Sequence, residues 1–368
     1  MNKKKENILI CGAGHGGHAI SAYLSSLGHN VTFYSTSLNK VEAIKNNDNS
    51  ITSKGLLDGK FKLSKVTNSI DGVVGDNDYI FIVTDANAHK QYYAKNLANQ
   101  LTNQNIILAS PGIGGAMDFA HEVRKYNSAE NISVTETDTL MYACKSFEPG
   151  HVTIKSLKEE LLYVTIPTKT KSIEGFINST YPQFINSKNP LMGLDDSPVF
   201  HIVGMIANAH RIQNKEDFNF YIDGITPEVA KYMEEMDTER CEVAKRVGIE
   251  PRTIKQWLNV AYGVKETNLY DMVQNTSPYM NDAQNKNRSP APKTLYHRYL
   301  LEEIPLRAVP TVSIAKVFGI EVPKYVEMID RTCELTGINF WKVGRTFNDM
   351  GITEKEIKNW KNLYTWRE

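Results

Sequence analysis

Short apolar runs alternate with amphipathic segments along the first half of the chain. Strand-like apolar runs lie at residues 8–11, 31–34, 79–83, 106–109, 133–135 and 161–166, and helical spacing of apolar positions lies at 17–27, 38–46, 89–101 and 116–125. This alternation predicts a mainly parallel sheet whose strands are joined by crossover helices. Residues 151–156 and 161–166 flank a short polar segment, which predicts a hairpin that closes the sheet.

The pattern changes after about residue 187, where strand signals nearly vanish and helical periodicity takes over. One helix is expected to start at Ser197-Pro198 and another at Thr226-Pro227, with the threonine as N-cap and the proline in the first turn. Further helices are expected at 252–262, 296–303, 309–318, 324–336 and 354–364, and an irregular loop at 281–293. The sequence therefore predicts an α/β domain over residues 1–187 and an all-helical domain over 188–368, with a cleft between them.

A glycine-rich turn directly follows the first predicted strand. Gly12, Gly14 and Gly17 form a G-x-G-x-x-G pattern that opens the first predicted helix, and its variable positions are Ala13, His15 and Gly16. The first glycine permits a tight turn, the second lets a pyrophosphate approach the backbone, and the third lets helix and strand pack closely. Amides at the helix N-terminus then hold the phosphates. This context predicts a Rossmann-type, doubly wound dinucleotide-binding domain; a merely structural turn is the alternative.

The choice of dinucleotide depends on the end of the second strand. Sites for NAD usually carry an acid there, which binds the ribose 2′-hydroxyl. This chain instead has Ser35 and Thr36, with Lys40 close by and no acid before Glu42. A 2′-phosphate could bind such hydroxyls and the lysine, so the sequence favours NADP(H), with NAD(H) as the alternative. Nothing else in the chain indicates a flavin.

Two further strand ends carry polar or glycine-rich segments. Thr84 follows the strand-like run at 79–83, and Ser110 and Gly112 follow the run at 106–109. Ligands of open α/β sheets bind outside the carboxyl ends of the strands. Thr84, Ser110 and Gly112 are therefore predicted to contact the cofactor.

Composition excludes several classes of protein. The 42 basic and 42 acidic residues balance, so no bulk field attracts nucleic acid. The four cysteines are scattered without metal-ligand spacing, which predicts reduced thiols and no metal site. Neither a signal peptide nor an apolar run of membrane-spanning length is evident, so we expect a cytoplasmic protein that does not bind a membrane.

Several short motifs, in this order, resemble the opine dehydrogenases. Besides the glycine turn and the segment at 110–115, they include residues 136–145, Asn208-Ala209-His210, residues 237–240, residues 298–305 and residues 344–346. The resemblance implies a Rossmann domain, a helical domain and an enzyme that joins an amino acid to a 2-oxo acid and reduces the imine with NADH or NADPH. Its partners would be these small molecules, and the C-terminal helices could pair in a homodimer.

The resemblance also implies roles for individual residues. His210 corresponds to the catalytic histidine, Glu303 to its acidic partner and Arg298 to the arginine that binds the oxo acid's carboxylate. Histidine suits proton transfer near neutral pH, a carboxylate fixes its tautomer, and a guanidinium binds a carboxylate with two hydrogen bonds. His201 and His297 are competing candidates for the histidine.

The chain departs from the family's pattern at two positions. Relatives usually have Asp where Glu303 stands, which leaves Glu302 as an alternative partner. Many relatives also carry an Asn one turn before the histidine, where this chain has Ile206; the nearest is Asn208, which we assign to substrate binding.

Two other functions compete with an opine dehydrogenase. Ketopantoate reductases and glycerol-3-phosphate dehydrogenases also join a Rossmann domain to a helical one, but they use a catalytic lysine, and Lys231 and Lys245 lack the surrounding motif. A dinucleotide-binding protein without catalysis is the second alternative.

Overall fold

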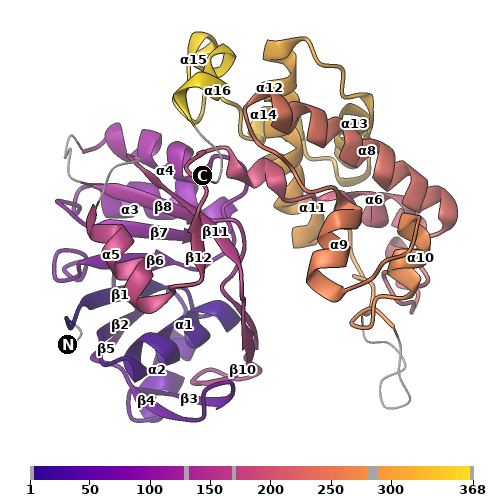
Figure 1. The fold of residues 1–368 in the computed structure, drawn as a ribbon. Coiled ribbons are helices and arrows are strands. Elements are labelled where there is room, and N and C mark those ends of the chain that lie inside the picture. The colour runs from indigo at the N-terminus through magenta and orange to yellow at the C-terminus, as the bar shows by residue number, and fades with distance from the viewer. Residues whose placement is uncertain (1–3, 128–131, 168–170, 281–288, 365–368) are drawn as a thin grey trace. The chain divides into compact units, whose positions relative to one another are not determined.

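The computed structural model describes residues 4–127, 132–167, 171–280 and 289–364. The chain divides into two compact units, Met1–Pro190 and a second that begins at Leu191 (Figure 1). The first is an α/β unit and the second is helical, which confirms the predicted fold class.

An eight-stranded sheet forms the centre of the first unit, in the order β12-β11-β8-β7-β6-β1-β2-β5. Only the β11–β8 pair is antiparallel, so the sheet is mainly parallel, as predicted. Its strands are β1 (Asn7–Cys11), β2 (Asn30–Tyr34), β5 (Lys65–Thr67), β6 (Tyr79–Ile82), β7 (Asn105–Ala109), β8 (Ser133–Thr137), β11 (Leu161–Ile166) and β12 (Phe184–Asn186).

Both faces of this sheet are buried, because alternate residues of each strand enter different cores. Ile8 and Ile10 of β1 belong to one apolar cluster, and Leu9 and Cys11 belong to the other. The first cluster includes residues of α1 (His15–Ser26), α2 (Leu38–Asn46) and α5 (Lys171–Thr180), and the second includes residues of η1 (His89–Ala94), α3 (Lys95–Ala98) and α4 (Gly115–Arg124). The single helix predicted at 89–101 is thus a π-helical turn followed by a short α-helix.

The predicted hairpin of residues 151–156 and 161–166 is wrong. β10 (His151–Leu157) pairs with β3 (Ser50–Gly55) and β9 (Tyr142–Lys145) in a separate four-stranded sheet that also contains β4 (Gly59–Lys62). The neighbouring β11 lies in the large sheet instead. Burial explains the separation, since β10 alternates buried and exposed positions whereas β11 is almost wholly buried. The small sheet contacts α1.

The second unit is a cluster of helices in which α6 (Val199–Ala207), α8 (Pro227–Arg246) and α13 (Pro323–Thr336) contact one another. Thr226 caps α8, because its hydroxyl accepts a hydrogen bond from the backbone of Val229, as predicted. The other helices are η2 (Met192–Asp195), α7 (Ala209–Gln213), α9 (Ile254–Tyr262), α10 (Leu269–Gln274), α11 (Arg298–Leu301), η3 (Ile304–Ala308), α12 (Val309–Phe318), α14 (Phe340–Val343), α15 (Glu354–Lys358) and α16 (Trp360–Leu363). Residues 281–288 of the predicted loop lie outside the described residues.

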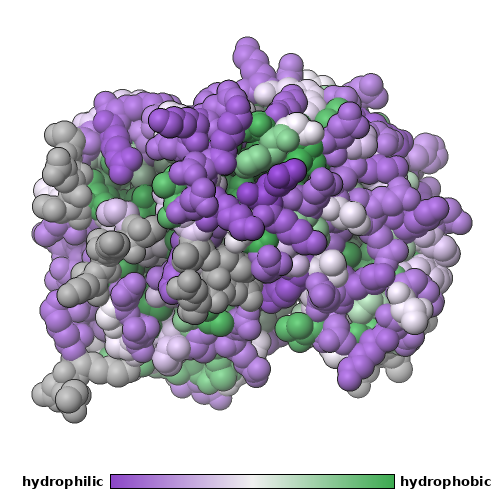
Figure 2. All heavy atoms as spheres, turned by 45° about the horizontal axis from the view of Figure 1, so that its top comes forward, coloured by the Kyte–Doolittle hydropathy of each residue, from purple (hydrophilic) through white to green (hydrophobic). Residues whose placement is uncertain are grey.

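The face drawn in Figure 2 is mainly hydrophilic, with its apolar residues in small, scattered groups. Among the described residues, no helix combines the length and the apolarity that crossing a membrane requires.

Candidate active site

The glycine turn connects β1 to α1 and has the geometry that its pattern predicts. Gly12 adopts a φ of +127°, and a Cβ on it would lie 2.4 Å from the carbonyl oxygen of Val83. A Cβ on Gly17 would lie 1.9 Å from the carbonyl oxygen of Gly12. Gly14 is the N-cap of α1, and no side chain caps the helix there. The amides of this N-terminus can therefore serve a phosphate.

The turn also lies where the strand order of the sheet reverses. β1 pairs with β2 on one side and with β6 on the other, so the chain winds outward from β1 both ways. Open α/β sheets bind their ligands at such a switch point, outside the carboxyl ends of the strands. The first unit thus offers a fitting cradle for a dinucleotide.

The end of β2 carries hydroxyls and a lysine. Ser35 is buried and its Oγ accepts a hydrogen bond from the Ser37 amide at 3.2 Å, whereas Thr36 is exposed. Lys40 Nζ donates to the carbonyl oxygen of Ala13 at 3.2 Å, so its positive charge lies at the glycine turn. Glu42 is paired with Lys45 at 2.9 Å.

The other predicted cofactor residues also lie at strand ends. The carbonyl oxygen of Thr84 is 3.3 Å from His89 Nε2, and the Oγ of Ser110 donates to the carbonyl oxygen of Asp138 at 3.4 Å. Ser110 and Gly112 both have positive φ, +51° and +83°, which turns the chain sharply after β7. Their cofactor contacts stay predictions.

Two histidines of the turn bind protein groups. His15 Nδ1 accepts a hydrogen bond from the Ser146 amide at 2.9 Å. His18 is buried; its Nδ1 lies 2.8 Å from the carbonyl oxygen of Gly14 and its Nε2 accepts from the Gly150 amide at 3.0 Å. Burial lowers the pKa of His18 to about 4, so the imidazole is neutral at pH 7.

In the helical unit, a histidine and a carboxylate meet. His201 Nδ1 lies 2.5 Å from Glu303 Oε1, and the imidazole stacks on the ring of Tyr299 with 3.7 Å between centroids and 6° between planes. The side chains of His201 and Glu303 are 29% and 17% exposed, respectively, so both are largely shielded from water but reachable. Glu303 fixes the tautomer in which Nδ1 carries a proton, and Nε2 is left to exchange protons.

The predicted pairing of His210 with Glu303 is therefore wrong. His210 is exposed and its ring nitrogens lie 3.2 Å from Asn214 Nδ2. Residues nine apart on a helix point in opposite directions, by roughly 180°. Here the helix also ends at Ala207 and restarts as α7, so His210 and His201 belong to different helices. The alternative candidate, His201, is the histidine that Glu303 engages.

The two predicted substrate-binding residues have other partners in the structure. Asn208 is buried; its Nδ2 donates to the carbonyl oxygens of Gly204 and Gly224 at 3.0 and 2.8 Å, and its Oδ1 accepts from Arg211. These bonds join α6 to the segment before α8, and the role of Asn208 in substrate binding stays a prediction. Arg298 is 66% exposed and paired with Glu302 at 2.9 Å, whereas the carboxylate that His201 meets belongs to Glu303. The role of Arg298 as a carboxylate clamp stays a prediction.

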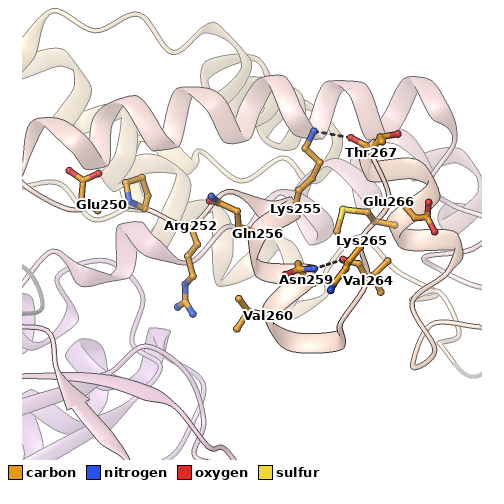
Figure 3. Close-up of a pocket in the computed structure, with 12 residues that line it drawn as sticks. Glu250, Arg252, Lys255, Gln256, Asn259, Val260, Val264, Lys265, Glu266 and Thr267 are labelled. Atoms are coloured by element: carbon orange, nitrogen blue, oxygen red, sulfur yellow. Dashed lines mark hydrogen bonds between the residues drawn. The ribbon is translucent and has the colours of Figure 1, made fainter.

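A hollow of about 730 Å³ lies beside α9 (Figure 3). Arg252 at its wall is held by Asp195, with a contact of 2.8 Å, and Lys255 is paired with Glu234 at 2.8 Å. Its lining residues do not include His201 or Glu303. The hollow is therefore separate from the histidine–carboxylate pair.

Comparison with known proteins relates these features to the opine dehydrogenases. Residues 194–336 match the family model described as "NAD/NADP octopine/nopaline dehydrogenase, alpha-helical domain". The chain is also 28% identical to an opine dehydrogenase of Arthrobacter sp. (strain 1C) over 94% of both proteins. The chain is an opine dehydrogenase relative. It is thus an opine-type dehydrogenase, a nicotinamide-dinucleotide-dependent oxidoreductase that acts on CH–NH groups.

Other opine dehydrogenase relatives agree. A D-nopaline dehydrogenase of Agrobacterium tumefaciens (strain T37) is 23% identical over 85% of this chain and 82% of its own length. The structure of octopine dehydrogenase with NADH and L-arginine has a TM-score of 0.78 at 20% identity, covering 95% of this chain and 97% of that one, which shows the shared fold. Residues 8–159 match a second model, "Ketopantoate reductase PanE/ApbA", which covers only the dinucleotide-binding half.

Proposed function

We propose that this dehydrogenase condenses an amino acid with a 2-oxo acid and reduces the resulting imine, with His201 moving the protons. The observation that carries the proposal is the bond between His201 Nδ1 and Glu303 Oε1. Solved relatives are described with NADH together with L-arginine, agmatine or pyruvate, which supports an amine and an oxo acid as the two substrates.

His201 suits the condensation because that step both takes up and releases protons. The amine nitrogen forms a bond to the carbonyl carbon and loses two protons, and the former carbonyl oxygen takes up two protons and leaves as water. The neutral imidazole accepts a proton at Nε2, and the imidazolium returns one to the leaving oxygen. Glu303 stabilises the imidazolium through Nδ1. The nicotinamide, when bound, supplies the two electrons and the hydrogen that reduce the imine carbon.

We further propose NADP(H) as the preferred cofactor. Thr36 is exposed at the end of β2, and Lys40 lies within hydrogen-bonding distance of the Ala13 carbonyl in the glycine turn. A 2′-phosphate would gain a cation and a hydroxyl there, and no carboxylate of residues 35–41 would repel it. A relative, yersinopine dehydrogenase, is described with NADP⁺ bound.

Arg298 is our candidate for the carboxylate of the oxo acid. It precedes Glu303, the partner of His201, by five residues, and its guanidinium is exposed. A guanidinium binds a carboxylate with two parallel hydrogen bonds. Arg298 would therefore remain paired if it released the Glu302 carboxylate and bound the carboxylate of the substrate.

The experiment follows the oxidation of NADPH and of NADH with a panel of amino acids and 2-oxo acids, singly and in pairs. Turnover only with both substrates, and a secondary-amine dicarboxylate in the mass spectrum, are expected. An equal rate with an oxo acid alone would instead indicate a 2-oxo acid reductase, the function that the ketopantoate reductase match favours. Tight binding of NADPH without turnover across the panel would indicate a non-catalytic protein.

A further inference from the structure

The second ring nitrogen of His201 has a partner that the sequence did not indicate. The hydroxyl of Tyr221 lies 3.3 Å from His201 Nε2, the nitrogen that Glu303 leaves free. Tyr221 lies in the segment between α7 and α8, twenty residues after the histidine. Any proton that His201 exchanges at Nε2 must therefore pass beside this hydroxyl.

Several contacts with neighbouring residues fix the position of the Tyr221 side chain. Its ring stacks on Tyr279, with 3.9 Å between centroids and 11° between planes, and meets Phe200 edge-on. Its backbone amide donates at 3.0 Å to Asn219 Oδ1, and the Nδ2 of this buried asparagine donates at 2.8 Å to the carbonyl oxygen of Tyr279. The hydroxyl is therefore fixed from both the ring and the backbone.

The proton of Tyr221 is not lost in the working range of the enzyme. Burial, followed by the neighbouring Tyr299, Tyr279 and Glu303, raises the pKa of Tyr221 well above its usual value. A neutral phenol both donates and accepts, so it can donate to the neutral imidazole and accept from the imidazolium. The other titratable groups around His201 are Glu303 on Nδ1, Tyr299 against the ring face, and His297, which lies edge-on to Tyr299 at 4.4 Å.

We propose that Tyr221 is a positioning residue that holds Nε2 of His201 in both protonation states and so supports proton transfer in the condensation. The inference rests on the proposed function of His201. Of the two bonds, the one that accepts from the imidazolium is charge-assisted and the stronger, so the hydroxyl favours the protonated histidine. The hydrogen bond from Tyr221 also restricts rotation of the His201 ring before the substrate binds.

Two variants of Tyr221 test this role. Tyr221→Phe keeps the ring and removes the hydroxyl, and 3-fluorotyrosine at 221 keeps both but makes the oxygen a weaker acceptor. The kcat/KM–pH profile should contain one limb that is absent from the profile of His201→Asn. In both Tyr221 variants this limb is expected to move to lower pH, by roughly half to one pH unit for Tyr221→Phe. Tyr221→Phe should also lower kcat by about 10-fold and leave the KM for NADPH unchanged.

Tyr232→Phe is the matched control, because it removes a hydroxyl of the same unit that donates to Glu327 at 2.8 Å. It should leave the profile unchanged. If neither Tyr221 variant moves the limb, or if only KM values change, the inference is overturned. Should Tyr221→Phe fail to fold, the fluorotyrosine variant decides alone, since it preserves the packing. If the wild-type protein forms no secondary amine, the proposed function has failed instead, and the two failures are distinguishable.

Discussion

Only one nitrogen of the His201 imidazole can meet a substrate, because Glu303 engages the other at 2.5 Å. A histidine held in this way is oriented and has a defined tautomer, which are the properties that a general acid and base requires. His210 has neither, since it is exposed beside Asn214.

The contrast between the two histidines gives a direct prediction. His201→Asn should lower kcat/KM by about 10²–10⁴-fold, the usual contribution of a general acid–base group, with little effect on NADPH affinity. His210→Asn is the matched control and should retain nearly full activity. Steady-state rates with both substrates, and NADPH titration by fluorescence, measure the two effects. The opposite ranking of the variants would restore His210 as the proton-transfer residue.

The residue after β2 should decide the choice of cofactor. Ser35→Asp places a carboxylate where NAD-binding sites carry one, so it should repel a 2′-phosphate and accept a hydrogen bond from a ribose hydroxyl. The ratio of kcat/KM for NADPH to that for NADH should fall by about 10–100-fold, or about 1.4–2.8 kcal/mol. Ser64→Asp adds the same charge before β5, at the amino ends of the parallel strands β2 and β5 and thus away from the carboxyl end of β2 that Ser35 follows, and should not change the ratio. A wild-type preference for NADH would contradict the cofactor assignment at once.

At the scale of elements, the β1–α1 turn depends on close backbone packing. A Cβ on Gly17 would lie 1.9 Å from the Gly12 carbonyl oxygen, so Gly17→Ala must separate the helix from the strand. We expect a loss of about 1–3 kcal/mol in the free energy of unfolding, and at least about 10-fold weaker NADPH binding.

Gly175→Ala in α5 is the control for this change. A Cβ on Gly175 would meet no atom within 4 Å, and alanine favours a helix over glycine by about 0.5–1 kcal/mol. This variant should be as stable as the wild type or more so. Unfolding in urea and NADPH titration of both variants provide the comparison, and an undisturbed Gly17→Ala would argue against the packing.

His18 ties this turn to the segment before β10 through Gly14 and Gly150. Its ordinary pKa of 6.5 is lowered to about 4 by burial, so above pH 6.5 it is neutral in the folded and unfolded chains alike. As the pH falls from there towards 4, only the unfolded chain binds the proton, and up to about 3 kcal/mol of stability is lost.

Stability measured between pH 7.5 and 4.5 checks this dependence. His18→Gln cannot titrate, so its free energy of unfolding should fall less steeply with acid than that of the wild type. Equal slopes for the two proteins would show that other groups control the acid sensitivity.

At the scale of the whole molecule, the chain contains two compact units with separate tasks: the first holds the dinucleotide turn and the second holds the His201–Glu303 pair. A ligand that binds only the folded first unit stabilises it by mass action. NADPH at about 100 times its Kd should add about 2.7 kcal/mol, which raises the Tm of that unit by about 5–10 °C. Differential scanning calorimetry with and without NADPH measures this, and Gly17→Ala should show a smaller increase.

The sequence alone determined the features that depend on neighbours along the chain. The glycine turn, the Thr226 cap and the alternation of strands with helices were all predictable, because each follows from local backbone geometry and periodicity. The class of enzyme followed from short motifs in a fixed order.

Contacts between distant segments required the tertiary structure. Strand pairing places β10 and β11 in different sheets. Glu303 bonds to His201, a residue 102 positions away, and the end of α6 at Ala207 puts His210 on another helix. The local sequence pattern does not distinguish His201 from His210, yet His201 is the one that bonds to the Glu303 carboxylate. The approach of Tyr221 to the same imidazole has the same cause, since a hydrogen bond across a fold leaves no periodic trace in the sequence.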